Sequence, residues 1–167
     1  MIERHFLFGV PYDRIEVVVH PQSIVHSMVE LVDGSVLAQL GFPTMELPIL
    51  YALTHPARLA DGGVTRFDPV AAGSLTFQEV DHARFPAFGL GVQAGVAGGT
   101  SPAVYNASNE VAVAGFLDGR IPFTAIPQVI ARALQAHATV AADSLETVLD
   151  ADRWARERAA EALGAPC

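Results

Sequence analysis

Apolar residues in the first quarter of the chain follow a pattern that is typical of β-structure. Residues 15–19 are rich in β-branched side chains, which favour strands. Two further apolar runs, 24–32 and 35–40, are separated by Asp33-Gly34. An Asp-Gly pair supplies the positive φ angles of a two-residue type I′ turn, so this stretch predicts a β-hairpin.

A two-residue turn would also fix the register of the hairpin. It would pair Val29 with Ala38 and His26 with Gly41. One face would then be apolar, and we expect it to be buried; it comprises Val25, Ser27, Val29, Leu31, Val36, Ala38 and Leu40. The opposite face, with His26 among its members, is mixed in character and suits a cleft or a subunit interface.

The chain becomes irregular after the hairpin. Gly41 to Thr44 ends the strand, and a short helix is expected over residues 48–53. Residues 54–72 contain several Gly and Pro residues and predict an irregular connection. Residues 74–77 favour one more short strand.

From Pro86 onward the apolar spacing is helical. Helices are expected over 88–96, over 101–118 with Ser101 as N-cap and Gly119 as its stop, and in a third segment capped by Thr124. Residues 144–163 are expected to form one helix or two abutting ones. This last segment carries a stripe of small residues that permits close helix packing: Val148, Ala151, Ala155, Ala159 and Ala162. Two ion pairs are expected on the solvent-exposed face of this segment, Asp152–Arg156 and Arg153–Glu157. The fold class is therefore α+β, with a hairpin-containing part followed by a helical bundle.

Composition and charge exclude several classes of protein and of binding partner. Hydrophobic residues make up 51% of the chain and charged residues 17%, which excludes a disordered protein. The net charge of −8 argues against a nucleic-acid partner and against an anionic membrane. No apolar run approaches the ~20 residues of a membrane helix. The single cysteine, Cys167, excludes an intrachain disulfide, so we expect a cytoplasmic protein.

The residues with catalytic potential form no complete site. His20 and His26 are compatible with metal binding, but no third ligand lies at a suitable spacing, so two hydrogen-bonded histidines near a sheet are favoured. Ser23 or Ser27 beside His26 would suit a hydrolase only with an orienting carboxylate and a nucleophile elbow, and neither is evident. Glycine-rich nucleotide motifs are also absent.

Several runs nevertheless resemble the 1-deoxy-D-xylulose 5-phosphate reductoisomerase family. The most specific is the block from His20-Pro21-Gln22-Ser23 through the hairpin to Pro43-Thr44-Met45. Further runs are Leu75-Thr76-Phe77, Phe85-Pro86 and Asn106-Ala107-Ser108-Asn109-Glu110. The opening Ile2-Glu3-Arg4-His5 is similar to the family segment that follows an Asn-Lys-x-Leu-Glu motif.

This resemblance implies an enzyme that uses NADPH and a divalent metal, Mn or Mg. It rearranges and reduces the sugar phosphate 1-deoxy-D-xylulose 5-phosphate to 2-C-methyl-D-erythritol 4-phosphate, in isoprenoid precursor synthesis. It also implies a homodimer. Residues 1–77 would be the C-terminal portion of the central catalytic and dimerisation domain, 78–85 a linker, and 86–167 the C-terminal helical domain.

By the same resemblance, Ser23, His26, Pro43 and Met45 are expected near the active site of a complete enzyme, with Pro43 and Met45 making apolar contacts. The catalytic, cofactor-binding and metal-binding motifs of the family are not among these 167 residues. The isolated chain is therefore expected to be inactive. A stand-alone dimerisation or binding module, and a non-functional remnant of the enzyme, remain alternatives.

Overall fold

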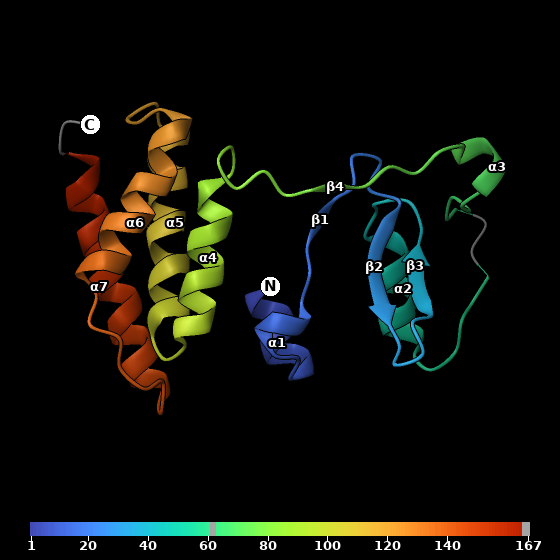
Figure 1. Ribbon diagram of the computed structural model, residues 1–167, viewed down its shortest axis with the longest axis horizontal. Coiled ribbons are helices and arrows are strands. Elements are labelled where there is room, and N and C mark those ends of the chain that lie inside the picture. Colours follow the sequence, from blue (N-terminus) through green and yellow to red (C-terminus); the bar gives the residue numbers. More distant parts are fainter. Residues whose placement is uncertain (61–62, 165–167) are drawn as a thin grey trace. The chain divides into compact units, whose positions relative to one another are not determined.

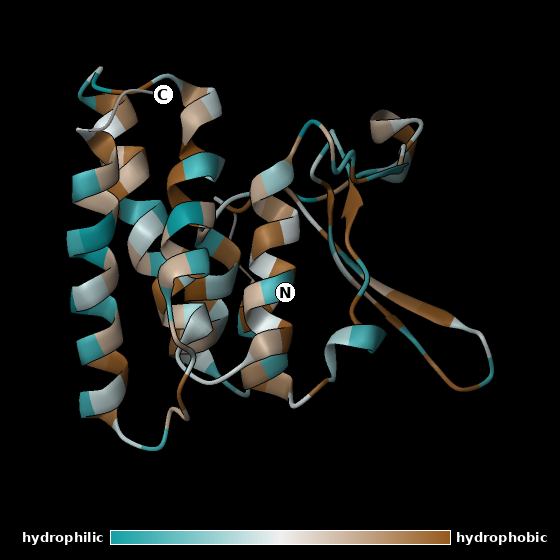
Figure 2. Ribbon diagram, turned by 60° about the vertical axis from the view of Figure 1, so that its left-hand side comes forward, coloured by the Kyte–Doolittle hydropathy of each residue, from teal (hydrophilic) through white to brown (hydrophobic). Residues whose placement is uncertain are grey.

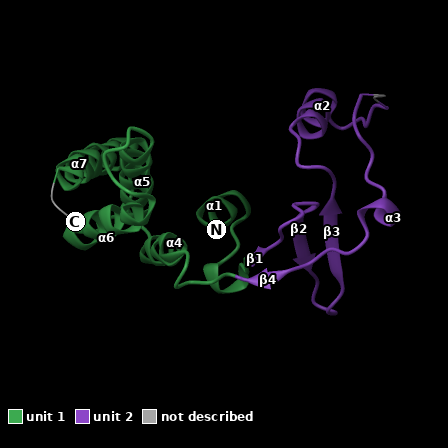
Figure 3. Ribbon diagram, turned by 90° about the horizontal axis from the view of Figure 1, so that it is seen from above, with its two compact units in different colours: residues 1–17, 80–167 green, residues 18–79 purple. Residues whose placement is uncertain are grey.

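The computed structural model describes residues 1–60 and 63–164, and it divides into two compact units. One unit is Val18–Glu79; the other combines Met1–Val17 with Val80–Cys167 (Figure 3). The α+β class expected from the sequence is confirmed. Residues 1–17 belong with the helical unit, although they precede the hairpin in sequence.

The described residues of the smaller unit form two separate two-stranded antiparallel sheets and two helices (Figure 1). Its elements are β1 (Val18–Val19), β2 (Val25–Glu30), β3 (Val36–Leu40), α2 (Glu46–Thr54), α3 (Pro69–Ala72) and β4 (Gln78–Glu79). Strand β1 pairs with β4, and β2 pairs with β3. The short strand expected over residues 74–77 does not form there; the strand in this region is β4, which begins one residue later. Helix α3 was not expected; the side chain of Asp68 caps it by accepting from the amides of Val70 and Ala71.

The hairpin forms where expected, but its register differs from the predicted one by one residue. Met28, not Val29, pairs with Ala38. The reason is a three-residue loop: Leu31 N–H donates to Ser35 O (2.8 Å) and Gly34 N–H donates to Leu31 O (3.0 Å). Gly34 takes the positive φ of this loop, 82°, in a conformation that favours glycine.

The register difference also changes which side chains share a face. Val36 and Ala38 lie on the face of Met28, not on that of Val29. The predicted burial is wrong as well: Val29 is 57% exposed and Leu37, its partner across the hairpin, is 64% exposed. Figure 2 shows much of the hairpin in the colour of hydrophobic residues. Both faces therefore carry apolar side chains that this unit leaves largely uncovered.

The described residues of the helical unit form two short N-terminal elements, four longer helices and a second 3₁₀ helix. These are α1 (Ile2–Phe8), the 3₁₀ helix η1 (Tyr12–Arg14), α4 (Pro86–Ala97), α5 (Ser101–Leu117), η2 (Phe123–Ala125), α6 (Ile126–Ala136) and α7 (Leu145–Leu163). Their order and boundaries confirm the predicted bundle within a few residues. Ser144, the first residue of the last expected helix, is the N-cap of α7 and accepts from Thr147 N–H at 3.1 Å. Ser101 is the first residue of α5 and Thr100 is its N-cap, and Thr124 lies inside η2 and caps no helix.

The core of the helical unit lies between α5, α6 and α7. Val104 on α5 and Ile130 on α6 are fully buried. The small-residue stripe of α7 packs here as predicted, with Ala151, Ala155 and Ala159 buried. Small side chains let two helices approach closely, which explains why an alanine-rich segment can hold this bundle together. No helix in the described part of the chain is both long and apolar enough to cross a membrane.

Candidate functional site

The turn His20-Pro21-Gln22-Ser23 is the centre of the smaller unit's polar contacts. Ser23 N–H donates to His20 O at 3.0 Å and closes the turn. Ser23 adopts φ 53°, the one positive φ among the described non-glycine residues. Such a conformation is uncommon outside glycine, asparagine and aspartate, and it often marks a constrained turn.

Residues 76 and 77 hold this turn in place. The His20 Nδ1 atom lies 2.8 Å from Thr76 O, and the His20 ring stacks on Phe77 with centroids 4.5 Å apart. Gln22 Nε2 donates to Thr76 Oγ1 at 2.9 Å, while Thr76 N–H donates to Gln22 Oε1 at 3.3 Å. Two runs that are 54 residues apart in sequence thus form one polar junction beside the β1–β4 pair.

His26 projects from an irregular point of the hairpin. The register shifts between Val25 and Ser27, so His26 is the extra residue of a bulge and does not pair with Gly41 as predicted. Bulges often re-aim a side chain. Here His26 Nε2 still lies 4.0 Å from the position that a Cβ on Gly41 would occupy. The exposed imidazole is therefore next to the end of β3.

Pro43 and Met45 follow directly on that strand end. Thr44 N–H donates to Phe42 O at 2.8 Å, which closes a three-residue turn centred on Pro43. Met45 is the N-cap of α2, and 67% of it is exposed. The turn therefore presents an apolar methionine at the surface, close in sequence to the glycine that faces His26.

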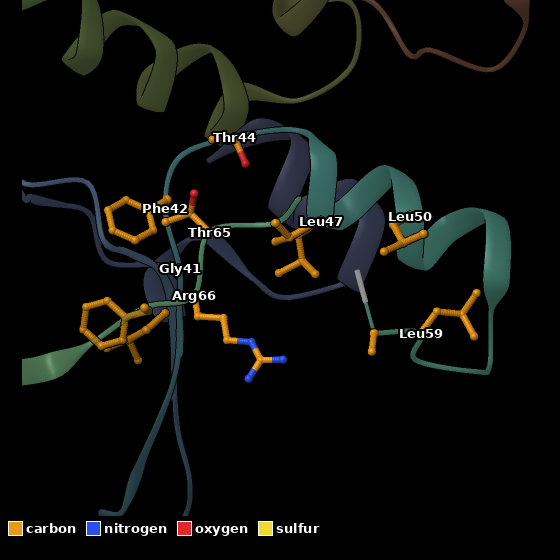
Figure 4. Close-up of a pocket in the computed structure, with 12 residues that line it drawn as sticks. Gly41, Phe42, Thr44, Leu47, Leu50, Leu59, Thr65 and Arg66 are labelled. Atoms are coloured by element: carbon orange, nitrogen blue, oxygen red, sulfur yellow. The ribbon is translucent and has the colours of Figure 1, made fainter. Parts of the chain in front are cut away.

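A hollow of about 280 Å³ opens beside this turn (Figure 4). It is lined by Gly41, Phe42 and Thr44 from the turn, by Leu47 and Leu50 of α2, and by residues of the 59–67 connection, including Arg66. The lining is mostly apolar, and Arg66 and two threonines are its polar groups. Such a surface can orient a small molecule, but it offers no acid–base pair.

The metal and nucleophile hypotheses find no support in this geometry. Within the described ranges, no group of three or more His, Cys, Asp or Glu side chains gathers to hold a metal ion. His20 is committed to Thr76, and its Nε2 atom is covered by protein. Among the hydrogen bonds of the described residues, none joins Ser23 or Ser27 to His26. The residues present therefore do not fit a metal centre or a serine nucleophile.

Comparison with known proteins places this geometry in a family. The profile described as the DXP reductoisomerase C-terminal domain matches residues 40–158. The chain belongs to the DXP reductoisomerase family. A 1-deoxy-D-xylulose 5-phosphate reductoisomerase of Nocardia farcinica is 56% identical over 167 residues, covering 99% of this chain and 42% of the relative. The corresponding protein of a Synechococcus strain is 53% identical over 164 residues, covering 96% and 41%.

Solved structures of this family share the fold. A reductoisomerase from Zymomonas mobilis in complex with NADPH superposes with a TM-score of 0.91 at 40% identity, covering 98% of this chain and 43% of that one. A reductoisomerase in complex with NADPH, fosmidomycin and magnesium gives 0.90 at 35% identity, covering 96% and 41%. The chain thus spans about two-fifths of the length of the relatives it matches.

The structure brings together some site residues that the sequence named separately and adds others. His26 and the Pro43–Met45 turn lie in one unit near Gly41. Ser23 lies in the turn that Thr76 and Phe77 anchor. Gln22 and Arg66 were not singled out for any role. No local signal marks them: Gln22 contacts Thr76, 54 residues away, and Arg66 lines a hollow that is formed with the turn at Gly41–Thr44 and with α2.

Proposed function

We propose that these residues form the C-terminal part of a reductoisomerase that converts 1-deoxy-D-xylulose 5-phosphate to 2-C-methyl-D-erythritol 4-phosphate. The observation that carries this proposal is the likeness over 98% of the chain to a reductoisomerase that binds NADPH. The complete enzyme would use NADPH and a divalent metal, Mg or Mn, in isoprenoid precursor synthesis in the cytoplasm. No group of three or more metal-ligating side chains gathers on the described residues, so the metal would be held by the remainder of the enzyme, which would also supply most of the NADPH site.

Within that enzyme, we assign to this chain a supporting part of the active site. Ser23, His26, Pro43 and Met45 would border the substrate and the nicotinamide. Met45 would exclude water from one side with its apolar side chain, and His26 would offer a polar contact. Residues 1–77 would belong to the catalytic and dimerisation domain, 78–85 to a linker and 86–167 to the helical domain. In this assignment residues 1–17 would belong to the catalytic domain although they pack with the helical unit. The exposed apolar hairpin supports assembly as a homodimer.

A chimera tests the proposal. The residues of the Nocardia farcinica reductoisomerase that precede the matched region would be joined to these 167 residues. We expect consumption of NADPH that depends on both the sugar phosphate and the metal. A chimera that folds and binds NADPH but does not turn over would contradict the proposal.

Substitutions in the same chimera test the assigned residues. We expect His26→Ala and Met45→Ala to lower kcat/KM by roughly tenfold to a hundredfold, the range for misplaced supporting groups. Leu145→Ala is the matched control, because Leu145 is an exposed apolar residue in the helical unit. Equal activity of all three variants would show that His26 and Met45 do not contribute to the active site.

A second candidate function is a stand-alone dimerisation or binding module. The exposed apolar residues of β2 and β3 favour it, since large uncovered apolar surfaces mark interaction sites. An inactive chimera whose isolated C-terminal chain still forms a stable dimer would favour this module. An inactive chimera without any assembly would favour a non-functional remnant.

A further inference from the structure

The connection between α6 and α7 is bonded to the start of α5. We call its residues 137–140 the strap. Thr100 N–H donates to Val140 O at 3.0 Å, and Val140 N–H donates to Thr100 Oγ1 at 3.2 Å. The hydroxyls of Ser101 and Thr139 are 2.7 Å apart. The strap therefore closes the end of the bundle where α5 begins.

The residue before Thr100 is shaped for this contact. Gly99 has φ 51°, and a Cβ built on it would lie 2.2 Å from Val140 O. Real Cβ atoms do not approach an oxygen so closely, so a side chain at position 99 would push the strap away. The strap therefore packs directly against this glycine.

His137 completes the contact through a buried hydroxyl. Its Nε2 atom lies 2.7 Å from Thr100 Oγ1, and Thr100 is fully buried. The hydroxyl oxygen already accepts from Val140 N–H, so its own proton is left to donate to a neutral Nε2. A doubly protonated ring would have to donate instead. The hydroxyl proton would then lack an acceptor among the hydrogen bonds of the described residues, which is costly inside a protein.

The other side of the His137 ring faces Trp154 and an open hollow. The two ring centroids are 5.1 Å apart. The hollow, of about 430 Å³, is lined by the strap and by Thr147, Asp150, Ala151 and Trp154 of α7. Asp150 is the charged group of this lining, and it already bonds Arg153 at 2.7 Å on the exposed surface. Thr100 and Ser101, on the α5 side, carry no charge.

We propose that His137 is a pH-sensitive latch. The neutral ring accepts a hydrogen bond from the Thr100 hydroxyl and holds the strap on α5; the protonated ring loses that bond, and the strap separates from α5 beside Trp154. This inference does not depend on the proposed function.

The direction of the pH dependence follows from the surroundings of the ring. Burial lowers the pKa of His137 from its ordinary value of 6.5. The open state, with the ring in water, therefore takes up a proton more readily than the latched state. The latch is complete above about pH 6.5 and is lost as the pH falls through the lowered pKa.

The chain contains one tryptophan, Trp154, so its fluorescence reports on the strap directly. The 167-residue chain would be titrated from about pH 8 to about pH 5, the range in which histidine changes charge. The readouts would be acrylamide quenching of Trp154 and hydrogen exchange of the Val140 amide. We expect both to rise severalfold, beyond the intrinsic effect of pH, with a midpoint below 6.5.

Variants distinguish opening of the strap from a simpler effect, in which the protonated His137 ring quenches Trp154 fluorescence while the strap stays in place. His137→Gln should abolish the transition while the strap stays closed, because a glutamine oxygen still accepts from Thr100. His82→Gln, in another part of the helical unit, should leave the transition unchanged. The proposal is overturned by any of three results: quenching that changes while Val140 stays protected, a midpoint at or above 6.5, or a transition that persists in His137→Gln.

Discussion

The ring of Tyr12 occupies the space where a side chain at position 95 would stand. A Cβ built on Gly95 of α4 would lie 2.7 Å from the ring carbons and the hydroxyl oxygen of Tyr12. Tyr12 also stacks on His5 with centroids 4.4 Å apart, and His5 Nδ1 lies 2.8 Å from Val10 O. Gly95 is therefore a point at which residues 1–17 attach to the helical unit.

Gly95→Ala is expected to weaken this attachment. Alanine normally stabilises a helix interior by about 1 kcal/mol relative to glycine, but crowding against a packed ring costs roughly 1–3 kcal/mol. We expect a net loss of stability and faster proteolysis near Tyr12, measured by thermal unfolding and limited digestion. Gly89→Ala is the control, since nothing lies within 4 Å of its added Cβ, and it should be neutral or stabilising. Equal stability of the two variants would contradict the contact.

Glu110 is expected to give the helical unit a measurable acid sensitivity. Hydrogen bonds from Arg156 and Asn106, together with the charge of Arg156, lower the pKa of Glu110 from 4.5. A lowered pKa in the folded state contributes stability above about pH 4.5, and this contribution is lost as the pH falls through the lowered value. The pair is exposed, so the effect should be small and should shrink in high salt.

Glu110→Gln tests this by unfolding midpoints measured across the acidic range at low and high salt. We expect its midpoint to fall less steeply with acid than that of the wild type. Glu157→Gln is the control, because the predicted pair of Glu157 with Arg153 does not form and Arg153 bonds Asp150 instead. Identical acid profiles for wild type and Glu110→Gln would show that the Arg156 contact contributes nothing.

The hairpin is expected to mediate self-association. Val29 and Leu37 are paired across it and mostly exposed, and apolar strands at the edge of a small sheet favour pairing with another chain. Sedimentation should show a concentration-dependent dimer, which Leu37→Glu shifts towards monomer. Leu145→Glu changes a leucine of α7 that is more exposed than Leu37, and it should leave the dimer in place. A stable wild-type monomer over a wide concentration range would rule out the dimer.

Much of the helical unit could be predicted from sequence because its signals are local. The cap at Ser144, the glycine after α5 and the alanine stripe of α7 each act within a few residues. The Asp152–Arg156 pair forms as expected, at 2.7 Å. Helix α3 was missed because its signal, Asp68 before Pro69, covers only one turn.

The smaller unit was harder to predict because its contacts are distant in sequence. The Asp33-Gly34 pair located the hairpin correctly, but a two-residue and a three-residue loop share that signal and differ by one residue in register. The bonds between Gln22 and Thr76 have no counterpart in local pattern. The block from His20 to Met45 led us to expect His26 and Met45 near each other at the end of β3. The roles of these two residues in a complete enzyme stay a prediction.

The most direct test of the account is NADPH consumption by the isolated 167-residue chain, with 1-deoxy-D-xylulose 5-phosphate and magnesium or manganese present. The reaction needs a bound metal, a fixed hydride donor and an anchored phosphate, and the described residues gather no metal-binding group. We expect no turnover by the chain alone, and turnover when the N-terminal part of a relative is supplied as a separate chain. Metal- and substrate-dependent NADPH loss with the chain alone, abolished by His26→Ala, would contradict the account.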